Sequence, residues 1–161
     1  MLTSITLLAA AIAAGPAAPT VSQVLHAPPI TAQPVWRPVR ADTVGDLLFT
    51  TETMGDRLRF VARGLKGAVP VTTSDFPADS VRAWVKSASE LVSSASPKQG
   101  EMRGLGQALT LNVTTTGAGE TVFGFYVGDA TTDQQLALAL TKAASLKLTA
   151  GVSSALDTMS H

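Results

Sequence analysis

A row of basic residues on one predicted strand is the strongest chemical signal in this sequence. The row consists of Arg57, Arg59 and Arg63, with Lys66 just beyond the strand. Side chains two positions apart on a β-strand project from the same face, so the three guanidinium groups would lie along roughly 20 Å of strand. Such a row could bind a carboxylate- or phosphate-bearing partner. The alternative is a solvated sheet face on which nearby acids such as Glu52 and Asp56 pair with the arginines.

Tyr126 extends this candidate surface. Together with Val61 and Val122 it points away from the apolar side of the predicted strands. An open sheet face that carries Arg, Tyr and Thr has the composition of a protein-binding surface. We therefore predict a binding surface formed by the arginine row, Lys66 and Tyr126.

The sequence gives no support for catalytic, metal-binding or cofactor-binding residues. It contains no cysteine, and its two histidines are His26, in a proline-rich segment, and His161, the last residue. Asp129 and Asp133 share one loop, but the alternating acidic ligands and the following Glu of a calcium loop are absent. The glycines at 104 and 106 precede a predicted strand, whereas a phosphate-binding loop is followed by a helix. We expect no catalytic residue, no metal and no cofactor.

The charge balance argues against nucleic acid as a partner. Twelve basic residues balance twelve acidic residues, so no net field attracts phosphate backbones. Together these charged residues make up 15% of the chain, below the roughly 25% of soluble domains.

The elements that must position these side chains follow from hydrophobic periodicity. Alternation predicts strands over 47–53, 57–63 and 69–73 and then, after a helix over 77–95, strands over 108–114, 121–127 and 136–140. A second helix is predicted over 142–159. A shift of 64 residues superposes the apolar stripes of the two helices, with Trp84 on Leu148 and Val92 on Leu156. The pattern predicts an α+β domain of duplicated β-β-β-α units, with pseudo-repeats at about 46–96 and 107–161.

In this prediction, antiparallel sheets of about six strands carry both amphipathic helices on one face. The two meanders could join edge to edge or stack as separate layers. The flanking strands lack guarding prolines or lysines apart from Pro70, which favours homodimerisation by edge pairing or face packing.

The first 36 residues contain no Lys, Arg, Asp or Glu. The apolar run at 5–14 is shorter than the roughly 20 residues that span a bilayer, and it fits the core of a secretory signal. Small residues suitable for cleavage lie around Ala13, Ala17 and Ala32, although the usual positive charge at the start is missing. We predict a signal peptide and proline-rich linker over 1–33, an α+β domain over 34–161, export to the periplasm or medium, and no membrane span after cleavage. The alternative is an alanine-rich leader in a cytoplasmic protein.

These observations favour a small exported, non-enzymatic module that binds a protein or envelope component through an open sheet face or a strand edge. Two other functions remain open. One is a carrier of a small apolar ligand, held in a pocket between helices and sheet that is lined by Phe60, Trp84, Phe123 and Phe125. The other is a hydrolase that uses carboxylates alone.

Overall fold

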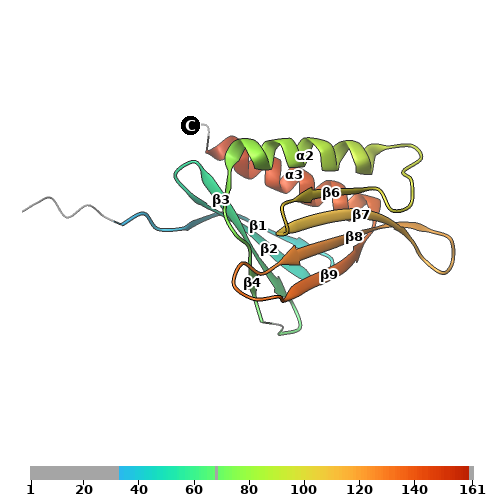
Figure 1. The fold of residues 1–161 in the computed structure, drawn as a ribbon, viewed down its shortest axis with the longest axis horizontal. Helices are drawn as coiled ribbons and strands as arrows, with labels where there is room; N and C mark the ends of the chain where they lie inside the picture. The colour runs from blue at the N-terminus through green and yellow to red at the C-terminus, as the bar shows by residue number, and fades with distance from the viewer. Residues whose placement is uncertain (1–32, 68, 160–161) are drawn as a thin grey trace, which may run out of the picture. The chain divides into compact units, whose positions relative to one another are not determined.

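The computed structural model describes residues 33–67 and 69–159, and these residues form two antiparallel sheets and two helices (Figure 1). Sheet A has the order β1–β2–β3–β4, with β5 also paired to β3, and sheet B has the order β6–β7–β8–β9. The strands of sheet A are β1 (Arg37–Val44), β2 (Leu47–Met54), β3 (Arg57–Gly64), β4 (Val71–Thr72) and β5 (Phe76–Pro77). Those of sheet B are β6 (Met102–Leu105), β7 (Leu109–Thr115), β8 (Thr121–Gly128) and β9 (Gln135–Leu140). Helix α2 (Ala78–Ser93) follows sheet A, and helix α3 (Lys142–Thr158) follows sheet B.

The predicted α+β class with antiparallel sheets is therefore confirmed, but the sheets hold five and four strands in place of about six in total. Strands β1, β5 and β6 are additional to the prediction. The predicted signal peptide and most of its linker lie outside the described residues. Neither α2 nor α3 is long and apolar enough to cross a membrane.

Glycine makes the tight turns of the first meander possible. Gly45 and Gly55 each open a two-residue turn, after Val44 and Met54, with φ of 59° and 63°. A positive φ at the first turn position is typical of the hairpin turns that match strand twist, and glycine adopts it without a Cβ clash. These turns fix the registers of β1 on β2 and of β2 on β3.

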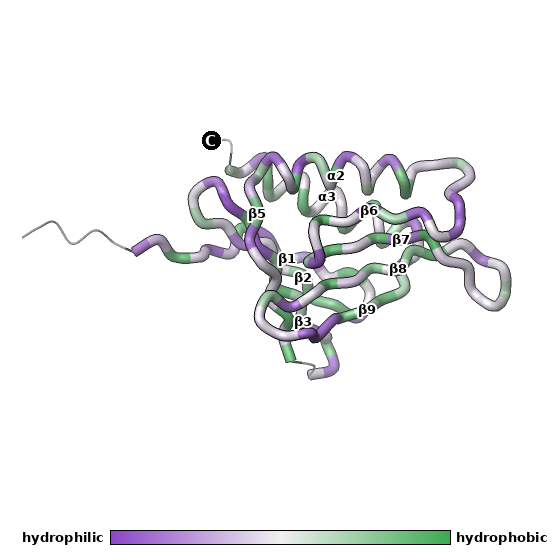
Figure 2. The backbone as a smooth tube through the Cα atoms, in the orientation of Figure 1, coloured by the Kyte–Doolittle hydropathy of each residue, from purple (hydrophilic) through white to green (hydrophobic). Residues whose placement is uncertain are grey.

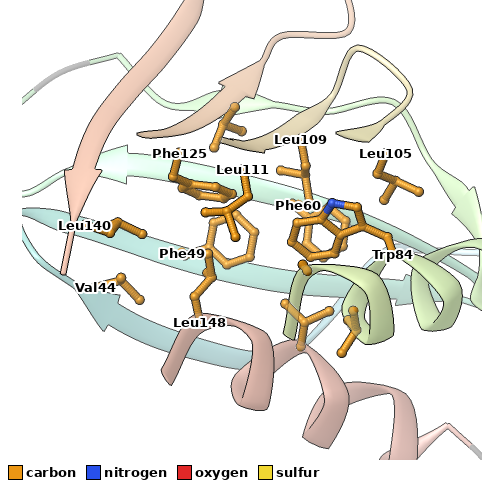
Figure 3. Packing of buried hydrophobic residues seen from close by; sticks show 14 of the residues in the cluster. Val44, Phe49, Phe60, Trp84, Leu105, Leu109, Leu111, Phe125, Leu140 and Leu148 are labelled. Atoms are coloured by element: carbon orange, nitrogen blue, oxygen red, sulfur yellow. The ribbon is translucent and has the colours of Figure 1, made fainter. Parts of the chain in front are cut away.

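The core lies where the inner faces of the two sheets meet (Figure 3). Phe49 of β2 stacks on Phe60 of β3 with 5.3 Å between ring centroids, and its ring also meets Phe125 of β8 edge-on at 5.7 Å. All three side chains are buried. The meanders thus form separate sheets packed against each other, which answers the question that alternation alone left open.

Each helix packs against the first strand of the other sheet. Trp84 of α2 donates a hydrogen bond from Nε1 to the backbone oxygen of Arg103 on β6, at 3.2 Å. Lys147 of α3 donates to the backbone oxygen of Thr43 on β1, at 3.0 Å. The helices also lie side by side (Figure 1). Each helix therefore connects its own sheet to the other one. The predicted arrangement, with both helices on one face of the sheet, did not include this exchange.

Candidate binding surface

The arginine row lies on the outer face of sheet A. Along β3, Leu58 and Phe60 point into the core, so the arginines that alternate with them point outward. Arg57 and Arg59 are half-buried and Arg63 is exposed. The structure thus brings the three predicted arginines together on one sheet face.

Arg59 is the most constrained member of the row. Its Nε lies 2.7 Å from a carboxylate oxygen of Glu52, the residue directly opposite on β2. Its guanidinium also lies over the ring of Trp36, 4.5 Å from the ring centroid. The side chains of Arg59 and Glu52 are 30% and 18% exposed, so this group is held at the surface in one geometry. Trp36 is not among the predicted binding residues, because it precedes the first predicted strand, which begins at residue 47.

Arg57 and Lys66 are each paired with a carboxylate. Arg57 forms an ion pair with Asp75 and donates a second hydrogen bond, of 3.1 Å, to the backbone oxygen of Asp75. The hydrogen bond from Arg57 lowers the pKa of Asp75. Lys66 lies in the turn after β3, 3.3 Å from Asp46, and both side chains are largely exposed, so this pair contributes little to stability.

Arg63 is different, because its side chain forms no ion pair with any residue in the described part of the chain. Across the ladder it faces Leu48 of β2. The outer face of sheet A therefore carries three arginines against two carboxylates, Glu52 and Asp75, a formal charge of +1. The half-buried residues between its charged groups are Leu48, Thr50 and Val61.

Tyr126 does not belong to this surface. It lies on β8, on the outer face of sheet B, where it neighbours Thr110 and Ala137 across the ladder. Because the inner faces of the two sheets pack together, their outer faces point in opposite directions. The structure therefore separates Tyr126 from the arginine row. Alternation correctly showed that Tyr126 points outward, but it carried no information about which sheet the strand joins.

Asp129 is a structural residue of the β8–β9 loop. Its carboxylate accepts hydrogen bonds from Thr131 N at 2.8 Å, Thr131 Oγ1 at 2.7 Å, Thr132 N at 3.0 Å and Thr72 N at 3.2 Å. These donors, Thr131 foremost, hold the pKa of Asp129 far below its usual range. Since Thr72 belongs to β4, the carboxylate also ties the loop to sheet A. No cluster of three His, Cys, Asp or Glu suited to a metal occurs among the described residues.

Replacing Asp129 with alanine should destabilise the protein at neutral pH, because four donors would lose their acceptor. A carboxyl group whose pKa is depressed by folding stabilises the fold above its unfolded pKa of about 3.9, and that contribution fades as the pH falls toward the folded pKa. Urea unfolding at neutral and at acidic pH measures this: the gap between wild type and D129A should shrink in acid. Asp133→Ala is the matched control in the same loop. An equal loss of stability in the Asp129→Ala and Asp133→Ala variants would contradict the structural role of Asp129.

The aromatic residues proposed to line a carrier pocket are core residues. Phe60, Trp84, Phe123 and Phe125 are each no more than 3% exposed. One surface hollow touches Phe123, but its rim is formed by Ser94, Pro97 and Lys142 and it opens to solvent. These side chains fill the space between sheets and helices, so the geometry gives the carrier function no particular support.

Comparison of the chain with protein-family models, with curated proteins and with solved structures finds no match in any of the three.

Proposed function

We propose that this protein is a small exported, non-enzymatic module that binds a protein partner through the outer face of sheet A. The observation that carries the proposal is the group in which Arg59 lies between the Trp36 ring and the Glu52 carboxylate on an open sheet face. Trp and Arg are the residue types that most often dominate binding energy at protein interfaces. Here both are already held in place, so binding would cost less side-chain entropy.

The charges on this face indicate what the partner must present. Arg57 and Arg59 already have carboxylates, whereas Arg63 at the end of the row has none among the described residues. The uncharged centre around Leu48 and Val61 suits an apolar patch. We therefore expect a partner surface with an apolar centre and one carboxylate opposite Arg63, in an envelope protein or another exported protein.

Charge reversal at Arg63 should weaken this binding. Arg63→Glu would place a carboxylate opposite the partner's own, and Trp36→Ala would remove the platform beneath Arg59. The measurement is capture from an envelope fraction of the native host, followed by titration of the identified partner. Two matched controls lie elsewhere: Lys86→Glu on the exposed side of α2 and Tyr126→Ala on the outer face of sheet B. Equal binding by R63E and K86E would contradict the proposed surface.

The non-enzymatic part of the proposal has its own test. A broad hydrolase screen should show no turnover that depends on this protein. Turnover that is lost on changing one carboxylate, with the fold intact, would replace the binding module with the carboxylate-dependent hydrolase.

Export is tested by the intact mass of the protein in separated cell fractions. Loss of a segment that ends between Ala13 and Ala32, in the periplasm or medium, would support it. A full-length mass in the cytoplasm would refute export and leave the binding surface untouched.

We also infer that the two halves descend from a duplication. Each half contains a four-stranded antiparallel meander followed by one helix, and the helix positions matched by the 64-residue shift are buried in both halves. Aligning the two halves across related sequences would test this, and a lack of matching core positions would refute it.

A further inference from the structure

Strands β1, β4, β6 and β9 end the two sheet orders, and β5 is a two-residue strand that pairs only with β3. Of the four end strands, β1, β4 and β6 are protected against pairing with another chain. Strand β1 has a bulge between Pro38 and Arg40 and packs against α3. Strand β4 is two residues long, and the oxygen of Thr72 already accepts a hydrogen bond from Ala130. On β6, the oxygen of Arg103 accepts the hydrogen bond from Trp84. Bulges, short length and covering side chains are the usual means of blocking an exposed edge.

Strand β9 has none of these protections. Its six residues, Gln135–Leu140, include no charge and no proline, and its register on β8 runs without a bulge. After Gln135 the strand carries no hydrophilic residue (Figure 2). It lies at the margin of sheet B, opposite β6 (Figure 1). An unguarded edge of this length is a template for a further strand.

The ladder determines which backbone groups of β9 are available. Asp129 N donates to Gln134 O at 3.0 Å, at the start of this hairpin. In an antiparallel pair, residues that exchange hydrogen bonds alternate with residues that do not. The residues bonded to β8 are therefore Leu136, Leu138 and Leu140. The N–H and C=O groups of Gln135, Ala137 and Ala139 point away from the sheet.

We propose that a second copy of this chain occupies this edge, with the two β9 strands antiparallel and the two-fold axis at Ala137. Only residues with outward backbone groups can face each other in hydrogen-bonded pairs. Placing Ala137 opposite Ala137 of the second copy also places Gln135 opposite Ala139 in both directions. Every outward group then finds a partner, giving about six intermolecular hydrogen bonds at two per facing pair. Shifting the axis by one residue along the strand would leave end groups without partners.

The side chains agree with this register. Leu136 and Leu138 point toward the core side of β9 and are only half-buried, whereas inner residues of the neighbouring β8 are buried. In the proposed pair Leu136 faces the second copy's Leu138, in the non-hydrogen-bonded positions where side chains approach most closely. Ala137 and Ala139 lie on the other face and are too small to clash.

Pairing two short strands covers little surface. Interfaces below about 1,200 Å² are typical of weak or transient complexes. We therefore expect a monomer–dimer equilibrium that depends on concentration.

Charge substitutions at Ala137 test the pairing, because this residue faces itself across the axis. Ala137→Lys and Ala137→Glu should each weaken dimerisation about fivefold or more, since like charges become directly opposed. An equimolar mixture of the two should recover it through the mixed dimer. Analytical ultracentrifugation of the full chain over a range of concentrations is the measurement, and circular dichroism confirms folding of each variant.

Ala137→Pro and single cysteines test the hydrogen bonds and the register. The proline should abolish the dimer and spare the monomer, because this N–H is not bonded to β8. Since the protein has no cysteine, A137C should form an intermolecular disulfide at a Cα separation of about 5.5 Å. Ala139→Cys, on the same face of β9, is the matched control and should not.

A protein that stays monomeric at all concentrations would overturn the proposal. So would a dimer that is unaffected by all the Ala137 substitutions, or equal cross-linking of A137C and A139C. None of these outcomes bears on sheet A, and R63E should leave the dimer unchanged.

Discussion

Replacing Phe49 with alanine is expected to lower the free energy of unfolding by about 3–5 kcal/mol. Phe49 is 2% exposed and contacts aromatic rings from both sheets, Phe60 beside it on β3 and Phe125 across the interface on β8. Truncation removes the buried ring and leaves a cavity between two rigid sheets, which cannot close without breaking the hydrogen bonds of their ladders. Domains of this size are stable by about 5–15 kcal/mol in total, so F49A should lose a large share of the stability of the fold.

Chemical denaturation followed by tryptophan fluorescence measures this loss. Phe49→Leu should cost much less, since it keeps most of the buried volume. Tyr126→Ala removes an aromatic ring from the outer face of sheet B and should cost far less than F49A, because its site is only half-buried. Similar losses for F49A and Y126A would mean that the inner faces do not form the main core.

Hydrophobic periodicity was sufficient to place most of the fold. Strand β3 begins at the predicted residue, and helix α2 begins one residue after its predicted start. The predicted helix stripes are buried: Trp84 and Leu148, matched by the 64-residue shift, are 3% and 1% exposed. In these segments one face is fully buried, so the sequence pattern and the burial pattern coincide.

Strands β1 and β6, which the sequence pattern did not predict, lack a fully buried face. In β1 only Val44 is fully buried, and the contacts of this strand with α3 include polar ones, such as the hydrogen bond from Arg40 to Ser154. Strand β6 contains Gly104, and only Leu105 is buried in it. Both strands form because they make backbone hydrogen bonds to a neighbouring strand, β1 to β2 and β6 to β7. This pairing depends on tertiary structure, so it requires no alternation of apolar and polar residues in the strand itself.

In the candidate binding surface, too, the sequence predicted the face on which residues lie but not the residues that they contact. Period-two alternation correctly placed Arg57, Arg59 and Arg63 on one face. The residues that contact these arginines come from other parts of the chain. Asp75, the partner of Arg57, lies between β4 and β5. Trp36, which contacts Arg59, precedes β1, a strand that the sequence pattern did not predict. No local signal in the sequence could identify either contact.

Replacing Gly151 with alanine should destabilise the protein, which is the opposite of the usual effect of this substitution inside a helix. Replacing glycine with alanine inside a helix normally stabilises a protein by about 0.5–1 kcal/mol. Gly151, however, lies against β1, where a Cβ would overlap Asp42 Oδ2 and stand 3.1 Å from Asp42 Cγ and 3.3 Å from Arg40 Nε. Asp42 cannot easily move away, because Arg40 holds both of its carboxylate oxygens, at 2.6 and 3.0 Å. We expect G151A to destabilise the protein by about 1–3 kcal/mol, the cost of overpacking.

A double-mutant cycle isolates this contact. In an Asp42→Ala background the obstacle is gone, so adding Gly151→Ala should become neutral or stabilising, whereas it is destabilising in the wild type. Ala150→Gly, on the exposed side of the same helix, is the matched control and should cost about 0.5–1 kcal/mol by helix propensity alone. If G151A stabilises the wild type, then α3 does not approach β1 closely. The packing of α3 against the first strand of the other sheet depends on that approach, because a Cβ at Gly151 would overlap the Asp42 carboxylate on β1.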